Sequence, residues 1–146
     1  MLLAFGCAVV QASRIEFATR NPMDPELDDL DDQWAAQNKL LYEELQEYLA
    51  NATVWLKWQF SDRLNNHCGL LQFHTSRNHE NPEIRNLAEF LAQQSPGTYG
   101  LIYVHSEDRQ RMSVLRILGG RVSQHQDNFF SPFANPDAFG DLLRSD

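Results

Sequence analysis

The stretch NPEIRNLAEFLAQQSPGTYGLIYVH, residues 81–105, decides the fold class because it places a helix and a strand in succession with clear boundaries. Asn81 followed by proline is typical of a helix start, and apolar residues then recur at helical spacing. Ser95-Pro96-Gly97 ends this helix. Residues 99–105 have the aromatic and β-branched composition of a strand.

Three further elements are predicted upstream of this stretch. Residues 53–60 and 68–75, TVWLKWQF and CGLLQFHT, read as two strands that pair as a hairpin across a polar turn at 61–67. A long amphipathic helix precedes them, starting near Asp24, with Asp28 and Asp31 as alternative caps, and running to about Ala50. The side chains of the two helices that are expected to face a sheet are Trp34, Leu41, Leu45, Ile84, Leu87 and Leu91.

The first ten residues, MLLAFGCAVV, superficially resemble a signal peptide, but they lack a basic start and their apolar run is short. Their alternating pattern instead predicts a buried strand. No window approaches the ~20 apolar residues of a membrane helix, so no membrane association is expected. Cys7 and Cys68, two isolated cysteines, are typical of reduced thiols in a cytoplasmic protein.

The sequence pattern predicts strands at residues 112–118 and 121–125, which are either two separate strands or one strand bent at Gly119-Gly120. The order is therefore β-α-β-β-α-β-β in a single domain over residues 1–146. This order predicts an α+β fold, in which two helices cover one face of an antiparallel sheet, with a ferredoxin-like core plus an extra strand. Fold alone assigns no function.

Charge is the most informative feature of the 146 residues. The formal net charge is −8, and the segment from Asp24 to Glu47, with nine acids and one base, carries all of it. Such a chain repels phosphate backbones, which argues against nucleic-acid binding. The acids form either a solvated face or a docking surface for a basic partner. The candidate partner-binding acids are Asp28, Asp29, Asp31, Asp32, Glu43, Glu44 and Glu47.

The sequence contains no recognisable catalytic constellation. The common phosphate-loop, dinucleotide, zinc-protease and nucleophile-elbow motifs are absent. His74 and His79 could approach one another, but a metal site needs a third ligand, so structural or solvated histidines are the simpler interpretation. His67 cannot easily serve Cys68 as a base, because neighbours on a strand point to opposite faces. We therefore expect no enzyme activity, metal or cofactor.

Residues 74–108, HTSRNHENPEIRNLAEFLAQQSPGTYGLIYVHSED, resemble the centre of the immunity protein 7 family of bacterial polymorphic toxin systems. That family has a strand leading into an Asn-His turn, a helix, a Pro-Gly-x-Tyr-Gly-Leu-Leu-Tyr strand and an acidic turn. The corresponding positions here are Asn78-His79, residues 96–103 and Glu107-Asp108. Residues 127–132, DNFFSP, are similar to the family's Asp-Pro-Phe-Leu-Ser-Pro ending.

The resemblance implies a non-enzymatic antitoxin that protects its cell by binding and blocking a cognate toxin domain. Many such toxins are nucleases with basic clefts, which an acidic protein can occupy. We expect a monomer or weak homodimer. The alternative is a small ligand-binding regulatory domain or enzyme on a ferredoxin-like fold, which would need a polar pocket. Further candidate contact residues are Asn78, His79, Glu107, Asp108 and Phe129.

Overall fold

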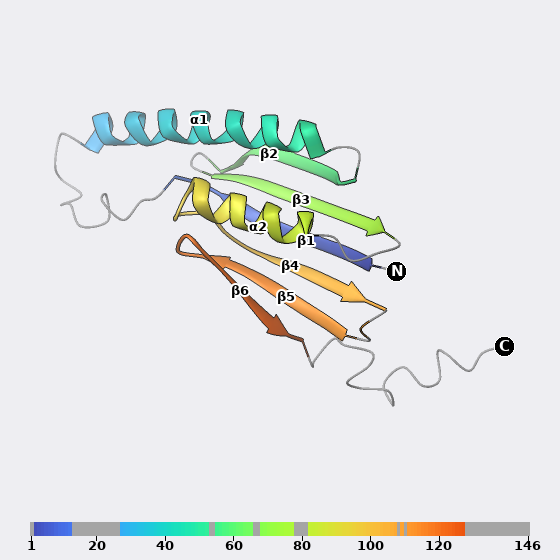
Figure 1. Cartoon of the computed structure of the whole chain (residues 1–146). Helices are drawn as coiled ribbons and strands as arrows, with labels where there is room; N and C mark the ends of the chain where they lie inside the picture. Colours follow the sequence, from blue (N-terminus) through green and yellow to red (C-terminus); the bar gives the residue numbers. More distant parts are fainter. Residues whose placement is uncertain are drawn as a thin grey trace.

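The computed structural model describes residues 2–12, 27–52, 55–65, 68–77, 82–107, 109 and 111–127. Its elements, labelled in Figure 1, are β1 (Leu2–Val10), α1 (Leu27–Ala52), β2 (Lys57–Asn65), β3 (Cys68–Arg77), α2 (Glu83–Gln94), β4 (Tyr99–Ser106), β5 (Arg111–Leu118) and β6 (Arg121–Gln126).

The strands form one six-stranded sheet in the order β2-β3-β1-β4-β5-β6, and every pair of neighbours is antiparallel. Each helix connects two strands that have another strand between them. α1 leads from β1 to β2 across β3, and α2 leads from β3 to β4 across β1. The predicted α+β class, with two helices and an antiparallel sheet, is confirmed.

The predicted order contains one strand too few. β5 and β6 are separate strands, and Leu118 pairs with Arg121 across a two-residue turn. Gly119 and Gly120 occupy that turn with φ angles of 59° and 74°. Two successive positive φ angles define the tight turn that suits a hairpin, and glycine adopts them without strain. Of the two alternatives for residues 112–125, two separate strands are confirmed and one bent strand is wrong.

The predicted hairpin of residues 53–75 is present, but its boundaries differ. β2 starts at Lys57 because Trp55 and Leu56 donate backbone hydrogen bonds of 3.1 and 3.0 Å to the Ala52 carbonyl, which closes α1. β2 then extends to Asn65, through much of the segment predicted to be a turn. Its pairing with β3 shifts register between Ser61 and Asn65, which accommodates this polar stretch in the strand.

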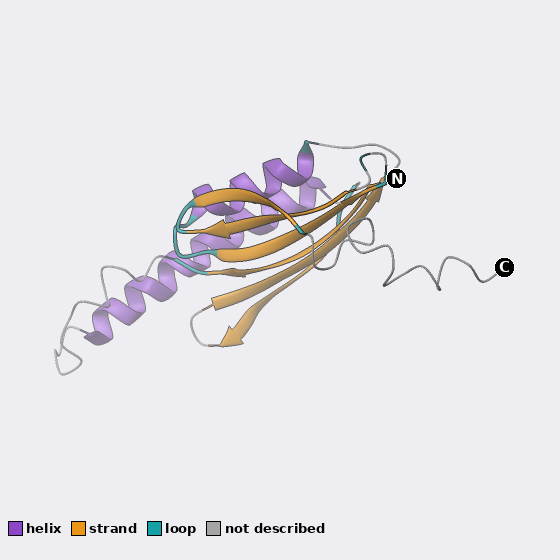
Figure 2. Ribbon diagram, turned by 90° about the horizontal axis from the view of Figure 1, so that it is seen from below, coloured by secondary structure: helices purple, strands orange, loops and turns teal. Residues whose placement is uncertain are grey.

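Both helices lie on the same side of the sheet, as Figure 2 shows. A continuous apolar core joins α1, α2 and the strands beneath them. The helices also contact each other where the rings of Tyr48 and Phe90 stack, 4.0 Å between centroids. On β1, the side chains under the helices include Ala4 and Ala8, which are 0% and 1% exposed. Such small side chains let the helices pack closely onto the centre of the sheet.

The core residues predicted from helical spacing are confirmed. All six are at most 7% exposed, and they are Trp34, Leu41, Leu45, Ile84, Leu87 and Leu91. Leu87 is fully buried between α2 and the sheet, with 0% of its surface exposed.

We predict that Leu87→Ala lowers the free energy of unfolding by about 2–5 kcal/mol, because it removes buried methyl groups and leaves a cavity. Leu40→Ala is the matched control, since Leu40 is 62% exposed on α1; its effect should stay within about 0.5 kcal/mol. Urea denaturation of both variants measures the difference. Equal stabilities would show that α2 does not pack as described.

Candidate functional site

The position of α1 is set by two hydrogen bonds to Ala12, just beyond the end of β1. The Trp34 indole Nε1 donates to the Ala12 carbonyl at 3.1 Å, and the Ala12 amide donates to Asn38 Oδ1 at 2.6 Å. Trp34 and Asn38 are 1% and 4% exposed. We call these two hydrogen bonds the Ala12 grip. Because Trp34 and Asn38 are one helical turn apart, the two bonds fix the orientation of the helix as well as its position.

The connection after α2 holds the preceding residue, Gln11, from the other side. The Gln11 amide donates to Thr98 Oγ1 at 3.4 Å, its side-chain Nε2 donates to the Gly97 carbonyl at 3.1 Å, and the Ser95 hydroxyl donates to the Gln11 carbonyl. A Cβ at Gly97 would lie 2.6 Å from the Ala12 carbonyl oxygen. The Ser-Pro-Gly-Thr segment that carries the family resemblance therefore has a structural task here.

With α1 held this way, the acids whose side chains the structure describes point to solvent. Asp32, Glu43 and Glu47 are all exposed. They are spaced by eleven and four residues, about three turns and one turn, so they share one side of the helix. We call these three residues the acidic stripe. Glu44 is also exposed but lies about 100° around the helix. Asp28, Asp29 and Asp31 lie in α1, but their side chains are outside the described part of the structure.

A groove of about 330 Å³ separates α1 from the edge strand β2, and we call it the α1–β2 groove. Its charged lining residues are Lys39, Glu43 and Asp62. Tyr42 also lines it, and the Tyr42 ring meets the Phe60 ring edge-on at 5.2 Å between centroids. Burial raises the pKa of Tyr42 to about 12, and the nearby Cys68 thiolate and Asp62 carboxylate add to the shift. Asp62 was missed from sequence because its segment was interpreted as a turn.

The remaining predicted contact residues follow the ends of strands. Glu107 is exposed directly after β4, while Asn78, His79, Asp108 and Phe129 lie outside the described residues. In the sheet register Leu2 pairs with both Arg77 and Ser106, so the ends of β3 and β4 lie at one end of the sheet. Glu107 is thus far along the sheet from the grip on Ala12.

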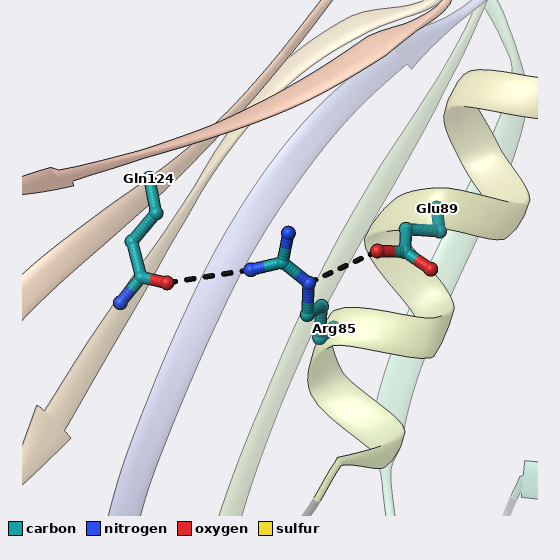
Figure 3. Close-up of polar contacts among 3 residues, drawn as sticks. All are labelled: Arg85, Glu89 and Gln124. Carbon is teal, nitrogen blue, oxygen red and sulfur yellow. Dashed lines mark hydrogen bonds and ion pairs between the residues drawn. The ribbon is translucent and has the colours of Figure 1, made fainter.

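A second hollow, which sequence reasoning missed, lies between the start of α2 and strands β4 to β6. It measures about 370 Å³ and its lining includes Arg85, Arg109 and Arg111. Arg85 bridges α2 and β6, because its Nε lies 3.0 Å from Glu89 Oε1 and its Nη1 lies 3.4 Å from Gln124 Oε1 (Figure 3). Arg85 comes from α2, whereas Arg109 and Arg111 lie at the β4–β5 connection and the start of β5, so the fold brings together residues that are distant in sequence.

The sheet face opposite the helices, which we call the open face, was also missed. No described helix lies over it (Figure 2). The alternation of each strand and the register of the sheet place these apolar side chains on it: Leu3, Phe5, Cys7, Val9, Tyr99, Leu101, Tyr103, Val114 and Leu118. Polar side chains share the face, among them Gln72, His74, His105, Arg116 and Ser123. The signal in the sequence was that both alternating sets of β1 are apolar.

Neither a group of metal-ligating side chains nor a helix that could span a membrane is found in the described part of the chain. There, no three His, Cys, Asp or Glu side chains gather in a way that could hold a metal ion. Neither α1 nor α2, as far as they are described, is long and apolar enough to cross a membrane.

The arrangement defines a small α+β protein whose distinctive features are surfaces: an acidic helix with an adjoining groove, and an apolar sheet face. Residues 23–137, well over half of the chain, match the immunity protein 7 family. The chain therefore belongs to this family of immunity proteins. Searches of curated proteins and of solved structures gave no match.

We predict that Asn38→Ala lowers the free energy of unfolding by about 1–3 kcal/mol, because the buried Ala12 amide loses its acceptor. Gln46→Ala is the control: Gln46 Nε2 donates to the Tyr42 carbonyl at 3.3 Å on the exposed side of the same helix. Its loss should change stability by less than about 0.5 kcal/mol. Urea denaturation measures both, and equal effects would show that the Ala12 grip contributes nothing.

Tyr42 provides a pH signature of the packing of α1 on β2. A group whose folded-state pKa is raised, here from 10.0 to about 12, contributes stability that is complete below pH 10.0 and is lost as the pH rises toward 12. We expect an ultraviolet titration of tyrosinate to show a step near pH 12 that Tyr42→Phe abolishes. If Tyr42→Phe instead removed absorbance that develops near pH 10, Tyr42 would lie in open solvent.

Proposed function

We propose that this protein is a non-enzymatic immunity protein that binds a cognate bacterial toxin domain and neutralises it by steric and electrostatic occlusion. The observation that carries the proposal is membership of the immunity protein 7 family over residues 23–137. In this proposal the whole chain acts as one domain, in the cytoplasm, as a monomer or weak homodimer and without a cofactor.

The charge distribution supports a basic partner, and a nuclease domain is the partner class that we propose. A nuclease needs a basic cleft to hold phosphates. The acidic stripe and the adjoining groove, with Glu43 and Asp62, project carboxylates into solvent from one side of the fold. Opposite charges raise the rate of diffusional encounter, and a protein lodged over the cleft excludes the substrate.

The test of function uses the C-terminal domain of the large secreted protein that is expected to be encoded beside this chain. Expression of that domain should arrest growth, and co-expression of this protein should restore it. The two purified chains should form a complex. Growth arrest that this protein does not relieve, with no complex by size-exclusion chromatography, would contradict the proposal.

We predict that Glu43→Lys/Glu47→Lys slows association with that toxin domain and flattens its salt dependence, with little change in dissociation, because exposed rim charges act on encounter. Lys39→Glu adds an acid on the same side of α1 and should speed association. Asp28→Lys/Asp32→Lys tests the start of the helix in the same way. Kinetics at several salt concentrations measure all three.

Charge changes of opposite sign should therefore move the association rate in opposite directions. If all of these variants bind and protect like the parent at every salt concentration, the acidic stripe is only a solvated surface.

A further inference from the structure

The centre of the open face, on β1 and β4, is more apolar than the solvent-facing side of an antiparallel sheet normally is. Polar side chains usually occupy that side. Here four of the five large hydrophobic side chains that are exposed in the described structure lie on it: Phe5 at 42%, Tyr99 at 46%, Leu101 at 41% and Leu118 at 49%. Contiguous exposed apolar surface of this kind marks an interaction site.

These side chains are contiguous because they lie on adjacent strands. Phe5 pairs with Tyr103, and Cys7 pairs with Leu101, across the central strands β1 and β4. The rings of Phe5 and Tyr103 stack nearly parallel, with centroids 5.1 Å apart and planes 9° from one another. A stacked aromatic pair on a rigid sheet loses little entropy on binding, which is typical of interface hot spots.

A hollow of about 500 Å³ lies beside Phe5, toward the edge strand β2. Its polar and cationic lining residues are Lys57, Gln59, Gln72 and His74. An apolar centre next to a polar recess is the anatomy of a protein–protein interface. The recess can take one side chain of a partner as an anchor.

The charged side chains that the structure describes on the strands of the open face are cationic, although the chain as a whole is acidic. Lys57 on β2, Arg116 on β5 and Arg121 on β6 are all exposed there. Two copies of the chain packed through this face would bring these like charges together, which is unfavourable. Charge complementarity therefore fits a different protein, one that presents an apolar surface bordered by carboxylates.

We propose that the open face is the surface on which the toxin domain is held, with the Phe5–Tyr103 pair at its centre and an acidic side chain of the toxin in the recess beside Lys57. This inference rests on the proposed function. The edge strand β2 contributes to both the recess and the α1–β2 groove. One partner that grips this edge reaches both surfaces, so the acids of α1 serve encounter and the open face serves retention.

Cys7 is a built-in reporter for this contact. It is exposed in the middle of the open face, whereas Cys68 is buried at 5% exposure. The aromatic disulfide DTNB should react quickly with Cys7 of the free protein, and Cys7→Ala should abolish that rapid phase. Saturation with the purified toxin domain should slow the reaction at least tenfold. An unchanged rate in a complex demonstrated by size-exclusion chromatography would overturn the proposal.

A second measurement uses dissociation kinetics. Phe5→Thr/Leu101→Thr keeps residues that favour strands and should raise the dissociation rate at least tenfold. Gln93→Ala/Gln94→Ala, at the exposed end of α2, is the control and should bind like the parent. If the threonine variant does not fold, Lys57→Glu/Arg116→Glu changes only exposed side chains and should weaken binding about tenfold. Parental binding by whichever of these variants folds would overturn the proposal.

The remaining outcomes separate this inference from the proposed function. If the parent protein neither binds nor protects, both fail. If it binds and protects while Cys7 stays reactive in the complex, only the open-face contact fails. Sedimentation of the parent should show a monomer; a dimer that Phe5→Thr/Leu101→Thr dissociates would assign the face to a second copy. If Cys7 of the free parent protein reacts slowly and deletion of residues 128–146 makes the reaction fast, the open face is assigned to that segment.

Discussion

Two residues at the end of the first strand carry the constraint on which the rest of the structure depends. The backbone of Gln11 and Ala12 is bound on one side by Trp34 and Asn38 of α1 and on the other by the connection from Ser95 to Thr98. A buried amide or carbonyl without a partner is costly, so each of these bonds stabilises the folded chain. They join both helices to the central strand.

This constraint separates the molecule into two chemically different sides. Because α1 is held by one side of the helix, its opposite side presents the acidic stripe to solvent. Because both helices occupy one side of the sheet, the other side is left with apolar side chains of β1 and β4 exposed. The first surface acts through long-range attraction, which salt screens; the second acts through desolvation on contact.

Much of the fold could be predicted because it depends on local pattern. Helical spacing identified Leu87 and Leu91 as core, and a glycine pair identified the break at residues 119–120. The glycine pair alone does not distinguish one bent strand from two strands joined by a hairpin turn, since a bend and a hairpin both use glycine. The length of β2 was also misjudged, because pairs of Ser61 with Leu70 and of Asn65 with Cys68 carry the strand across a polar segment whose own propensity favours a turn.

The site was less predictable, for a physical reason that β1 illustrates. Both of its alternating sets are apolar, so alternation alone cannot say which set the helices cover. Side-chain size decides it: Ala4 and Ala8 leave room for helices, whereas Phe5 would not. The groove beside Tyr42 and the arginine-lined hollow depend on contacts between distant segments, such as Arg85 with Gln124, which no sequence window contains.

The residues that hold the fold together and the residues on the exposed surfaces are different, and this difference bears on how an immunity protein acquires specificity for its toxin. Residues such as Ser95, Gly97 and Thr98 are committed to holding Gln11, so changing them would disturb the fold before it changed a partner. Exposed positions on α1 and the open face are under no such constraint, since surface substitutions usually alter stability by less than about 0.5 kcal/mol. Residues that identify the family and residues that choose the toxin are therefore expected to be different residues. The scaffold can then be kept while both contact surfaces change.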